Sequence, residues 1–154
     1  MSGLSSYDNS QIIQQLTELL IGSIFFINEK KVKQVISQYN LVEKYNVKKI
    51  YPNLLNIEIE PTKFVAEIKG TESFLVGSNG KLINNKYKSE TLPFLFGKFD
   101  KEKFLIFKKN VDASEFEFRN LKLILFYPSN RWDIQTNNGF LIKLPEIDLL
   151  EALN

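Results

Sequence analysis

Hydrophobic side chains recur at helical spacing along the first 40 residues. The first stripe follows N-cap side chains at 8–10 and stops before Gly22; it comprises Ile12, Ile13, Leu16, Leu19 and Leu20. The second follows Asn28 and stops near Asn40; it comprises Val32, Val35, Ile36 and Tyr39. Such i, i+3, i+4 patterns, each bounded by capping residues, predict two amphipathic helices.

The pattern then changes to strict alternation. Tyr45 and Val47 alternate with polar residues, and the alternation resumes at Leu55 after the turn Tyr51-Pro52-Asn53. A period of two indicates strands with one buried face. Residues 44–60 are therefore expected to form a hairpin, which together with the two helices makes a small α+β unit.

Residues beyond Pro61 are mainly strand-like. The segment 74–83 turns through Ser78-Asn79-Gly80, and 132–144 turns through Asn137-Asn138-Gly139. Glycines at these points suit a turn that needs positive φ. A three-residue loop with Gly139 left-handed pairs Ile134 with Ile142 and Trp132 with Leu144, so all four side chains share one face. Gly80 and Gly139 are thus interpreted as structural turn residues.

Other segments of this half carry weaker patterns. The mixed stretch 101–109 suggests a short helix, 115–119 alternates like a strand, and 121–126 is an apolar run typical of a buried strand. Residues 145–154 resemble the first turns of a helix. The predicted organisation is α+β, with a first domain at 3–62 and a mainly antiparallel β-domain at 63–154.

The composition narrows the chemistry. The chain has no Cys and no His, which excludes thiolate metal sites, cysteine nucleophiles and histidine general bases. Its 20 basic and 18 acidic side chains nearly balance, and Arg occurs only at 119 and 131, which argues against a nucleic-acid binder. Asp112, Glu115 and Glu117 are interpreted as solvated. We expect no catalytic residues, no metal, no cofactor and no enzymatic activity.

Four segments, in this order, resemble the FtsQ/DivIB family of bacterial cell-division proteins: VEKYNVKKIYPNLLNIEIEPTKFVAEI, FLVGSNGKLI, LPFLFG and RWDIQTNNGFLIKLPE. The resemblance implies a POTRA-like βααββ-type domain followed by a β-domain. The family's basic residue after the proline step is retained as Lys63. Of the family's first strand only Ser2-Gly3-Leu4 would remain, and its final partner-binding strand would lie beyond Asn154. The chain is thus expected to be a fragment of a longer protein.

The resemblance also implies a function. The parent would be a single-pass inner-membrane protein with this part on the periplasmic side and its anchor outside this chain. It would act as a non-catalytic divisome scaffold that recruits short coiled-coil bitopic proteins and the septal synthase complex. Two readings stay open beside it: a POTRA module of outer-membrane protein assembly or secretion, and, from another class, a carboxylate-dependent enzyme.

Sheet edges are the expected binding surfaces. In the first domain, Lys44, Asn46 and Lys48 are expected to face outward from an edge strand. In the second, Phe140, Ile142 and Leu144 are expected to lie on a newly exposed edge beside Arg131, which the resemblance makes a partner for an acidic segment. Such an edge should recruit a partner strand or self-associate, and a longer version with the final strand should be monomeric. Trp132 is expected to cap the core, with an exposed partner anchor as the alternative.

Overall fold

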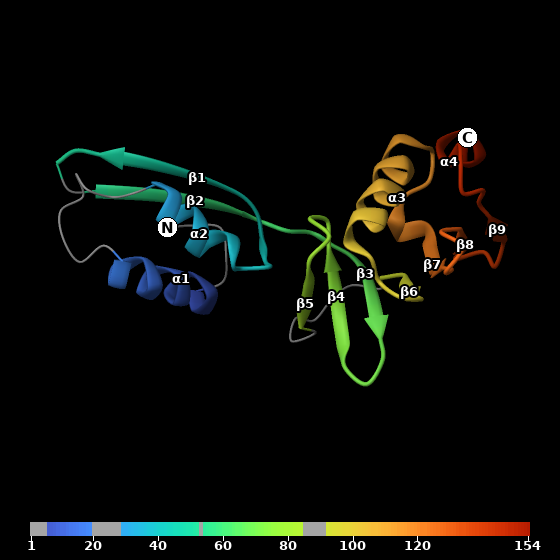
Figure 1. Cartoon of the computed structure of the whole chain (residues 1–154), viewed down its shortest axis with the longest axis horizontal. Helices are drawn as coiled ribbons and strands as arrows, with labels where there is room; N and C mark the ends of the chain where they lie inside the picture. Colours follow the sequence, from blue (N-terminus) through green and yellow to red (C-terminus); the bar gives the residue numbers. More distant parts are fainter. Residues whose placement is uncertain (1–5, 20–28, 53, 85–91) are drawn as a thin grey trace. The chain divides into compact units, whose positions relative to one another are not determined.

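A computed structural model describes residues 6–19, 29–52, 54–84 and 92–154 and divides the chain into two compact units, 1–62 and 63–154 (Figure 1). Helices and strands occur in both units. The predicted α+β class is therefore confirmed.

Unit 1 packs two helices against a hairpin. Its elements are α1 (Ser6–Leu19), α2 (Glu29–Ser37), β1 (Val42–Ile50) and β2 (Leu54–Pro61). The strands pair antiparallel with Val47 opposite Ile57, and both helices lie on the same side of the hairpin (Figure 1). Five members of the two predicted helical stripes lie in the core, and the strands add three more residues; the core contains Ile12, Leu16, Val32, Val35, Ile36, Val42, Ile57 and Ile59.

Some boundaries in unit 1 differ from the expectation. The helix α1 already includes Ser6, so residues 8–10 lie within the helix and do not cap it. Ile13 is exposed because the helix turns it away from the buried Ile12 and Leu16. The helix α2 ends at Ser37, before Asn40. The predicted stop at Gly22, the cap at Asn28 and the strand remnant at 2–4 lie outside the described residues.

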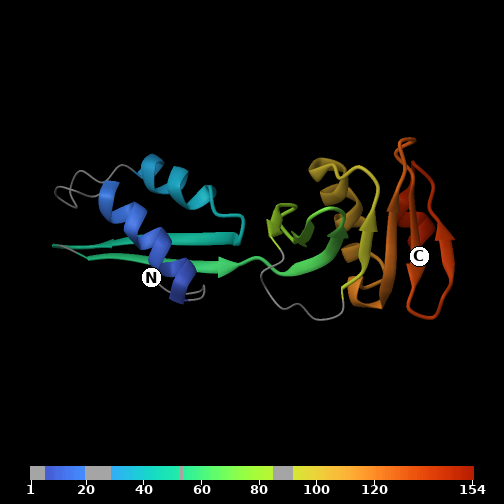
Figure 2. The same ribbon diagram turned by 90° about the horizontal axis from the view of Figure 1, so that it is seen from below.

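The described residues of unit 2 form a seven-stranded sheet in the order β5-β4-β3-β6-β7-β8-β9 (Figure 2). The strands are β3 (Phe64–Lys69), β4 (Ser73–Gly77), β5 (Leu82–Asn84), β6 (Phe94–Phe96), β7 (Leu121–Phe126), β8 (Trp132–Thr136) and β9 (Leu141–Lys143). Four of its six neighbouring pairs are antiparallel, whereas β6 runs parallel to both β3 and β7. The mainly antiparallel character of this sheet agrees with the prediction.

Helix α3 (Lys101–Ala113) covers one face of this sheet. Phe104, Phe107 and Val111 of α3 are fully buried, and α4 (Leu149–Leu153) adds Leu153 to the same core. The ring of Trp132 stacks between Phe107 and Phe126, at centroid distances of 4.4 Å and 4.3 Å. The expectation that Trp132 belongs to the core is confirmed.

The two predicted hairpins of unit 2 are present. Ile134 pairs with Ile142, and the Leu144 N–H donates to the Trp132 carbonyl at 2.9 Å, so the β8–β9 register is the one predicted. Gly139 has φ +91° in the three-residue loop. Gly80, at φ +70°, occupies the turn between β4 and β5.

Two features were not anticipated. The strand expected at 115–119 is wrong: a 3-10 helix occupies Phe118–Asn120, although Phe116 and Phe118 still pack against the core. The place in the sheet beside β7 is taken by β6, which the sequence did not mark as a strand. A three-residue strand is too short for the alternation of side chains to reveal it.

Gly97 provides a test of this architecture. A Cβ at Gly97 would lie 2.1 Å from the Phe126 carbonyl oxygen, and its φ is +109°. Gly97→Ala therefore combines a backbone clash with left-handed strain, and we expect it to lower the unfolding free energy of unit 2 by more than about 3 kcal/mol. Denaturant titration followed by Trp132 fluorescence measures this.

Gly139→Ala is the matched control, because Gly139 also has positive φ but a Cβ there would meet nothing within 4 Å. We expect it to cost about 1 kcal/mol, the conformational strain alone. Equal losses for the two variants would contradict the close approach of β6 to β7.

Candidate partner-binding surfaces

Strand β9 is a sheet edge. Within the described residues its neighbour is β8, and it closes the strand order of unit 2. The three residues predicted for this edge lie in different surroundings: Phe140 is 70% exposed, Ile142 is half-buried, and Leu144 is 1% exposed within the core. Of these side chains, Phe140 is the one that reaches solvent most fully.

The backbone N–H and C=O groups of β9 point alternately toward β8 and away from it. Thr136 N–H donates to Phe140 O at 3.0 Å, and Leu144 N–H donates to Trp132 O at 2.9 Å. In an antiparallel pair the residues bonded to the neighbour alternate with residues whose N–H and C=O point the other way. The outward backbone groups of β9 therefore belong to Leu141 and Lys143.

The side chains of Leu141 and Lys143 are exposed on the sheet face away from α3. Both are exposed, and Lys143 lies opposite Asp133 in the register. Neither residue was predicted from the sequence, because the pattern of hydrophobic residues assigned the edge to the row 140, 142 and 144. The predicted register could have identified Leu141 and Lys143, because in that register the residues whose side chains face the core are also the residues whose backbone groups bond to β8.

Arg131 is held by a buried carboxylate. Its Nε and Nη2 donate to Asp133 Oδ1 and Oδ2 at 3.0 Å and 3.3 Å, and the guanidinium lies 4.7 Å from the centre of the Tyr127 ring. The Asp133 side chain is 2% exposed and the Arg131 side chain 42%. The cation that the resemblance singled out thus compensates an internal charge and still presents part of its surface to solvent.

The predicted outward row of unit 1 is exposed. Lys44, Asn46 and Lys48 alternate along β1 with half-buried residues. Lys44 Nζ lies 3.7 Å from Glu60 Oε2 on β2, an exposed pair that contributes little to stability. Within the described residues β1 pairs with β2 alone, so this row lies on a strand with a free edge.

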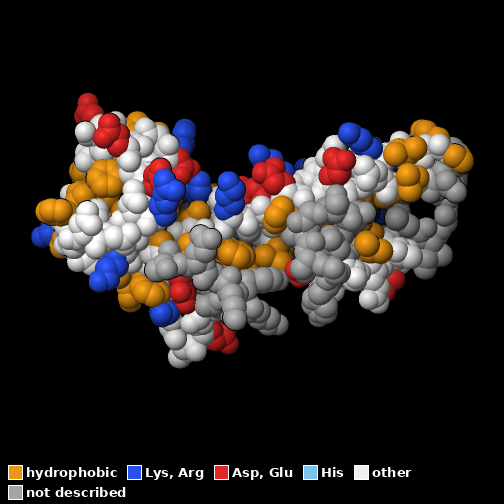
Figure 3. Space-filling model, turned by 180° about the vertical axis from the view of Figure 1, so that it is seen from behind, with side chains coloured by type: hydrophobic (Ala, Val, Ile, Leu, Met, Phe, Trp, Pro, Cys, Tyr) orange, Lys and Arg blue, Asp and Glu red, His pale blue; other side chains and the backbone are white. Residues whose placement is uncertain are grey.

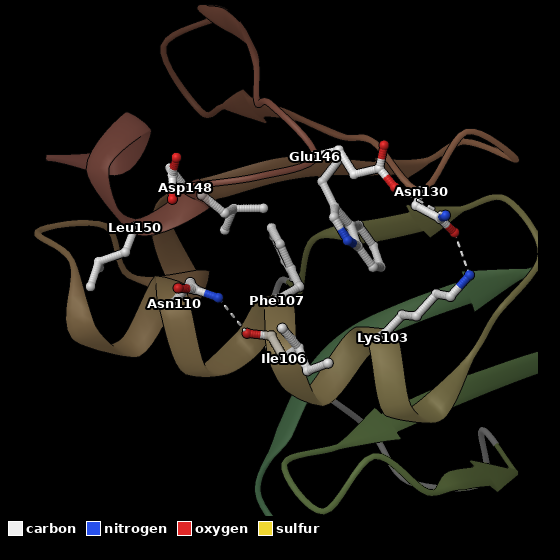
Figure 4. A pocket seen from close by; sticks show the side chains of 10 residues that line it. Lys103, Ile106, Phe107, Asn110, Asn130, Glu146, Asp148 and Leu150 are labelled. Atoms are coloured by element: carbon white, nitrogen blue, oxygen red, sulfur yellow. Dashed lines mark hydrogen bonds between the residues drawn. The ribbon is translucent and has the colours of Figure 1, made fainter.

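A cavity of about 550 Å³ lies between α3 and the segment leading to α4. Phe107 and Trp132 contribute apolar surface, and Asn130 joins its two sides (Figure 4). Lys103 Nζ donates to Asn130 Oδ1, and Asn130 Nδ2 donates to Glu146 Oε1 at 3.2 Å. These polar contacts connect α3 to the segment after β9.

Among the described residues, two titratable groups have clearly shifted pKa values, and neither lines this cavity. Burial raises the pKa of Tyr39, and burial together with the nearby Lys101 ammonium lowers the pKa of Lys81. In the part of the chain that the structure describes, no three Asp or Glu side chains gather as a metal site would need. Asp112 pairs with Lys108, and Glu117 pairs with Arg119.

No helix within the described ranges is long and apolar enough to cross a membrane.

The chain is similar to known proteins in both units. Residues 1–60 match the POTRA domain of FtsQ type. A protein of Rhizobium meliloti (strain 1021) named cell division protein FtsQ is 27% identical over 160 residues, which cover 100% of this chain and 51% of that protein. Proteins of the same name from Rhizobium radiobacter and Agrobacterium fabrum (strain C58) are 27% identical over 137 residues, or 85% of this chain.

These matches extend through both units. The chain spans about half the length of the relatives, 51% of the first and 64% and 42% of the other two. The type of POTRA domain and the shared name of the three relatives agree with the segments quoted from the sequence. The chain is thus similar along its length to proteins named cell division protein FtsQ, and its residues 1–60 match the POTRA domain of FtsQ type.

Proposed function

We propose that this chain is the periplasmic part of a bacterial cell-division protein that recruits partner division proteins without catalysing a reaction. The relatives bear the name of a cell division protein, and the chain lacks His and Cys. Its parent would be attached to the inner membrane through an anchor outside this chain. Short coiled-coil bitopic proteins and the septal synthase complex would be the partners.

The observation that carries this proposal is the edge of unit 2. Leu141 and Lys143 direct backbone N–H and C=O groups away from β8, and the exposed Lys143 lies opposite the buried Asp133, whose ion-pair partner Arg131 is partly exposed. An extended partner segment can pair with such an edge through main-chain hydrogen bonds. Carboxylates on that segment would be attracted to the Lys143 ammonium and to the exposed part of the guanidinium.

Leu141→Pro tests strand addition. Proline removes an N–H that points away from β8, so the β8–β9 ladder is retained, as is usual for proline on an edge strand. We expect the affinity for the acidic C-terminal peptide of the coiled-coil partner from the same organism to fall about tenfold or more, since one main-chain bond and its neighbours are lost. Isothermal titration of the 154-residue chain measures this.

Phe140→Ser is the control for this experiment. It removes a more exposed hydrophobic side chain than Leu141, but the Phe140 backbone bonds to Thr136. We expect the peptide to bind Phe140→Ser within about threefold of the parent chain, because each threefold change corresponds to only about 0.7 kcal/mol. If Phe140→Ser lost affinity and Leu141→Pro kept it, side-chain contact and not strand addition would be responsible.

The electrostatic part is tested with Lys143→Glu. Lys143 is exposed, so reversing its charge should weaken peptide binding at low salt, and the difference should shrink at high salt. Arg131→Ala is a poor binding test, because it leaves Asp133 buried without its cation. We expect that variant to lower the unfolding free energy by about 2 kcal/mol or more. Stability unchanged in Arg131→Ala would contradict the structural role of the pair.

The same edge predicts self-association. In the absence of a partner, two copies can pair through Leu141 and Lys143, so light scattering should detect concentration-dependent oligomers. Leu141→Pro should reduce them and Phe140→Ser should reduce them less. A chain that stays monomeric at every concentration would count against an accessible edge.

A further inference from the structure

The β1–β2 hairpin extends past the core of unit 1. The core and the side chains packed against it reach Val47 on β1 and Leu55 on β2. Beyond them Ile50 pairs with Leu54, and Ile50, Tyr51 and Leu54 are 48%, 65% and 54% exposed. We call Lys48, Lys49, Ile50, Tyr51 and Leu54 the hairpin tip.

The outer face of this hairpin changes character along its length. At the end far from the tip, Lys44 pairs with Glu60, and Asn46 lies opposite Glu58. Nearer the tip, Lys48 lies opposite the uncharged Asn56, whose Nδ2 donates to Glu58 at 3.2 Å. The face thus runs from an ion pair, through amides and a lysine, to hydrophobic side chains.

The two lysines of the hairpin tip lie in a segment of the sequence that contains no acidic residue. Between Val47 and Ile57 the charged residues are Lys48 and Lys49, and the acidic residues of β2, Glu58 and Glu60, come after that segment. Positive charge and hydrophobic surface therefore coincide at one end of the hairpin. This combination attracts a partner that is anionic at its surface and apolar beneath it.

The small number of exposed hydrophobic side chains at the hairpin tip favours a membrane over a protein partner. Hydrophobic side chains gather at the end of unit 1 that carries this tip (Figure 3). A specific protein interface usually buries about 800 Å² on each partner, with some twenty residues a side. Three exposed side chains do not supply that area, but they can enter the interfacial layer of a bilayer without needing a complementary surface.

We propose that the hairpin tip docks onto the surface of an anionic phospholipid bilayer. Ile50 and Leu54 would enter the boundary between headgroups and acyl chains. Tyr51 suits that boundary because its ring is apolar and its hydroxyl is polar. Lys48 and Lys49 would lie among the phosphates, their long side chains extending to the headgroups. This docking uses unit 1 alone and does not depend on strand addition at β9.

A fluorescent label at the hairpin tip tests the proposal directly. The chain contains no cysteine, so Tyr51→Cys introduces a single site for an environment-sensitive fluorophore. We expect vesicles of phosphatidylethanolamine and phosphatidylglycerol to shift its emission to the blue. Asn46→Cys is the matched control, since Asn46 is exposed on the same strand but lies toward the charged end. Its label should stay in water.

Three outcomes would overturn the proposal. One is no shift at position 51 with anionic vesicles, and another is an equal shift at positions 46 and 51. The third is a shift at position 51 on adding a division partner and none with vesicles, which would assign the hairpin tip to a protein.

A charge-reversal pair tests the electrostatic part. Lys48→Glu replaces an attraction with a repulsion, so binding of the whole chain to these vesicles should weaken by roughly tenfold or more. Lys33→Glu makes the same charge change at an exposed position on α2 and should weaken binding much less. Co-sedimentation at low and high salt measures both. Equal losses for the two variants would show attraction by net charge and overturn docking through the hairpin tip.

Discussion

The packing of Trp132 between Phe107 and Phe126 determines which residues of β8 and β9 face the core of unit 2. With Trp132 directed toward α3, alternation along β8 directs Ile134 the same way and Asp133 to the opposite face. The three-residue loop carries the register across to β9, so Leu144 is buried beside Trp132. A slip of one residue would exchange the two faces and bury Lys143.

In that register, the core-facing side chains and the outward backbone groups of β9 belong to different residues. The residues that point their side chains into the core also bond to β8, whereas Leu141 and Lys143 direct their backbone groups away from β8 and expose their side chains. The buried charge of Asp133 reinforces the arrangement, because Arg131 must stay close to compensate it. Arg131 is thus a structural residue, which compensates the charge of a buried carboxylate.

Much of the fold followed from periodicity. Val32, Val35 and Ile36 identified the buried face of α2, the asparagine-glycine turns located both hairpins of unit 2, and the register predicted for the β8–β9 hairpin was right. Strand β6 could not be predicted, because its three residues owe their place to parallel neighbours that lie far away in the sequence. The segment 115–119 alternates like a strand, but the sheet position beside β7 was already filled.

The candidate site was predicted in part. The sequence directed attention to 140–144 and to Arg131, but hydrophobicity favoured the row that the core already uses. Asp133 escaped notice because an acidic residue between two hydrophobic ones normally faces solvent, and its burial depends on Arg131 and on the strands beside it. Such a pair can be recognised only when the sheet is assembled.

Amide hydrogen exchange of the dilute chain, resolved by NMR, tests the central claim most directly. If β9 is an edge in this register, the Ile142 and Leu144 amides bond to β8 and should exchange slowly, while the Leu141 and Lys143 amides should exchange rapidly. Adding the partner peptide should slow Leu141 and Lys143 alone. Slow exchange at Leu141 and Lys143 in the free monomeric chain would contradict the account.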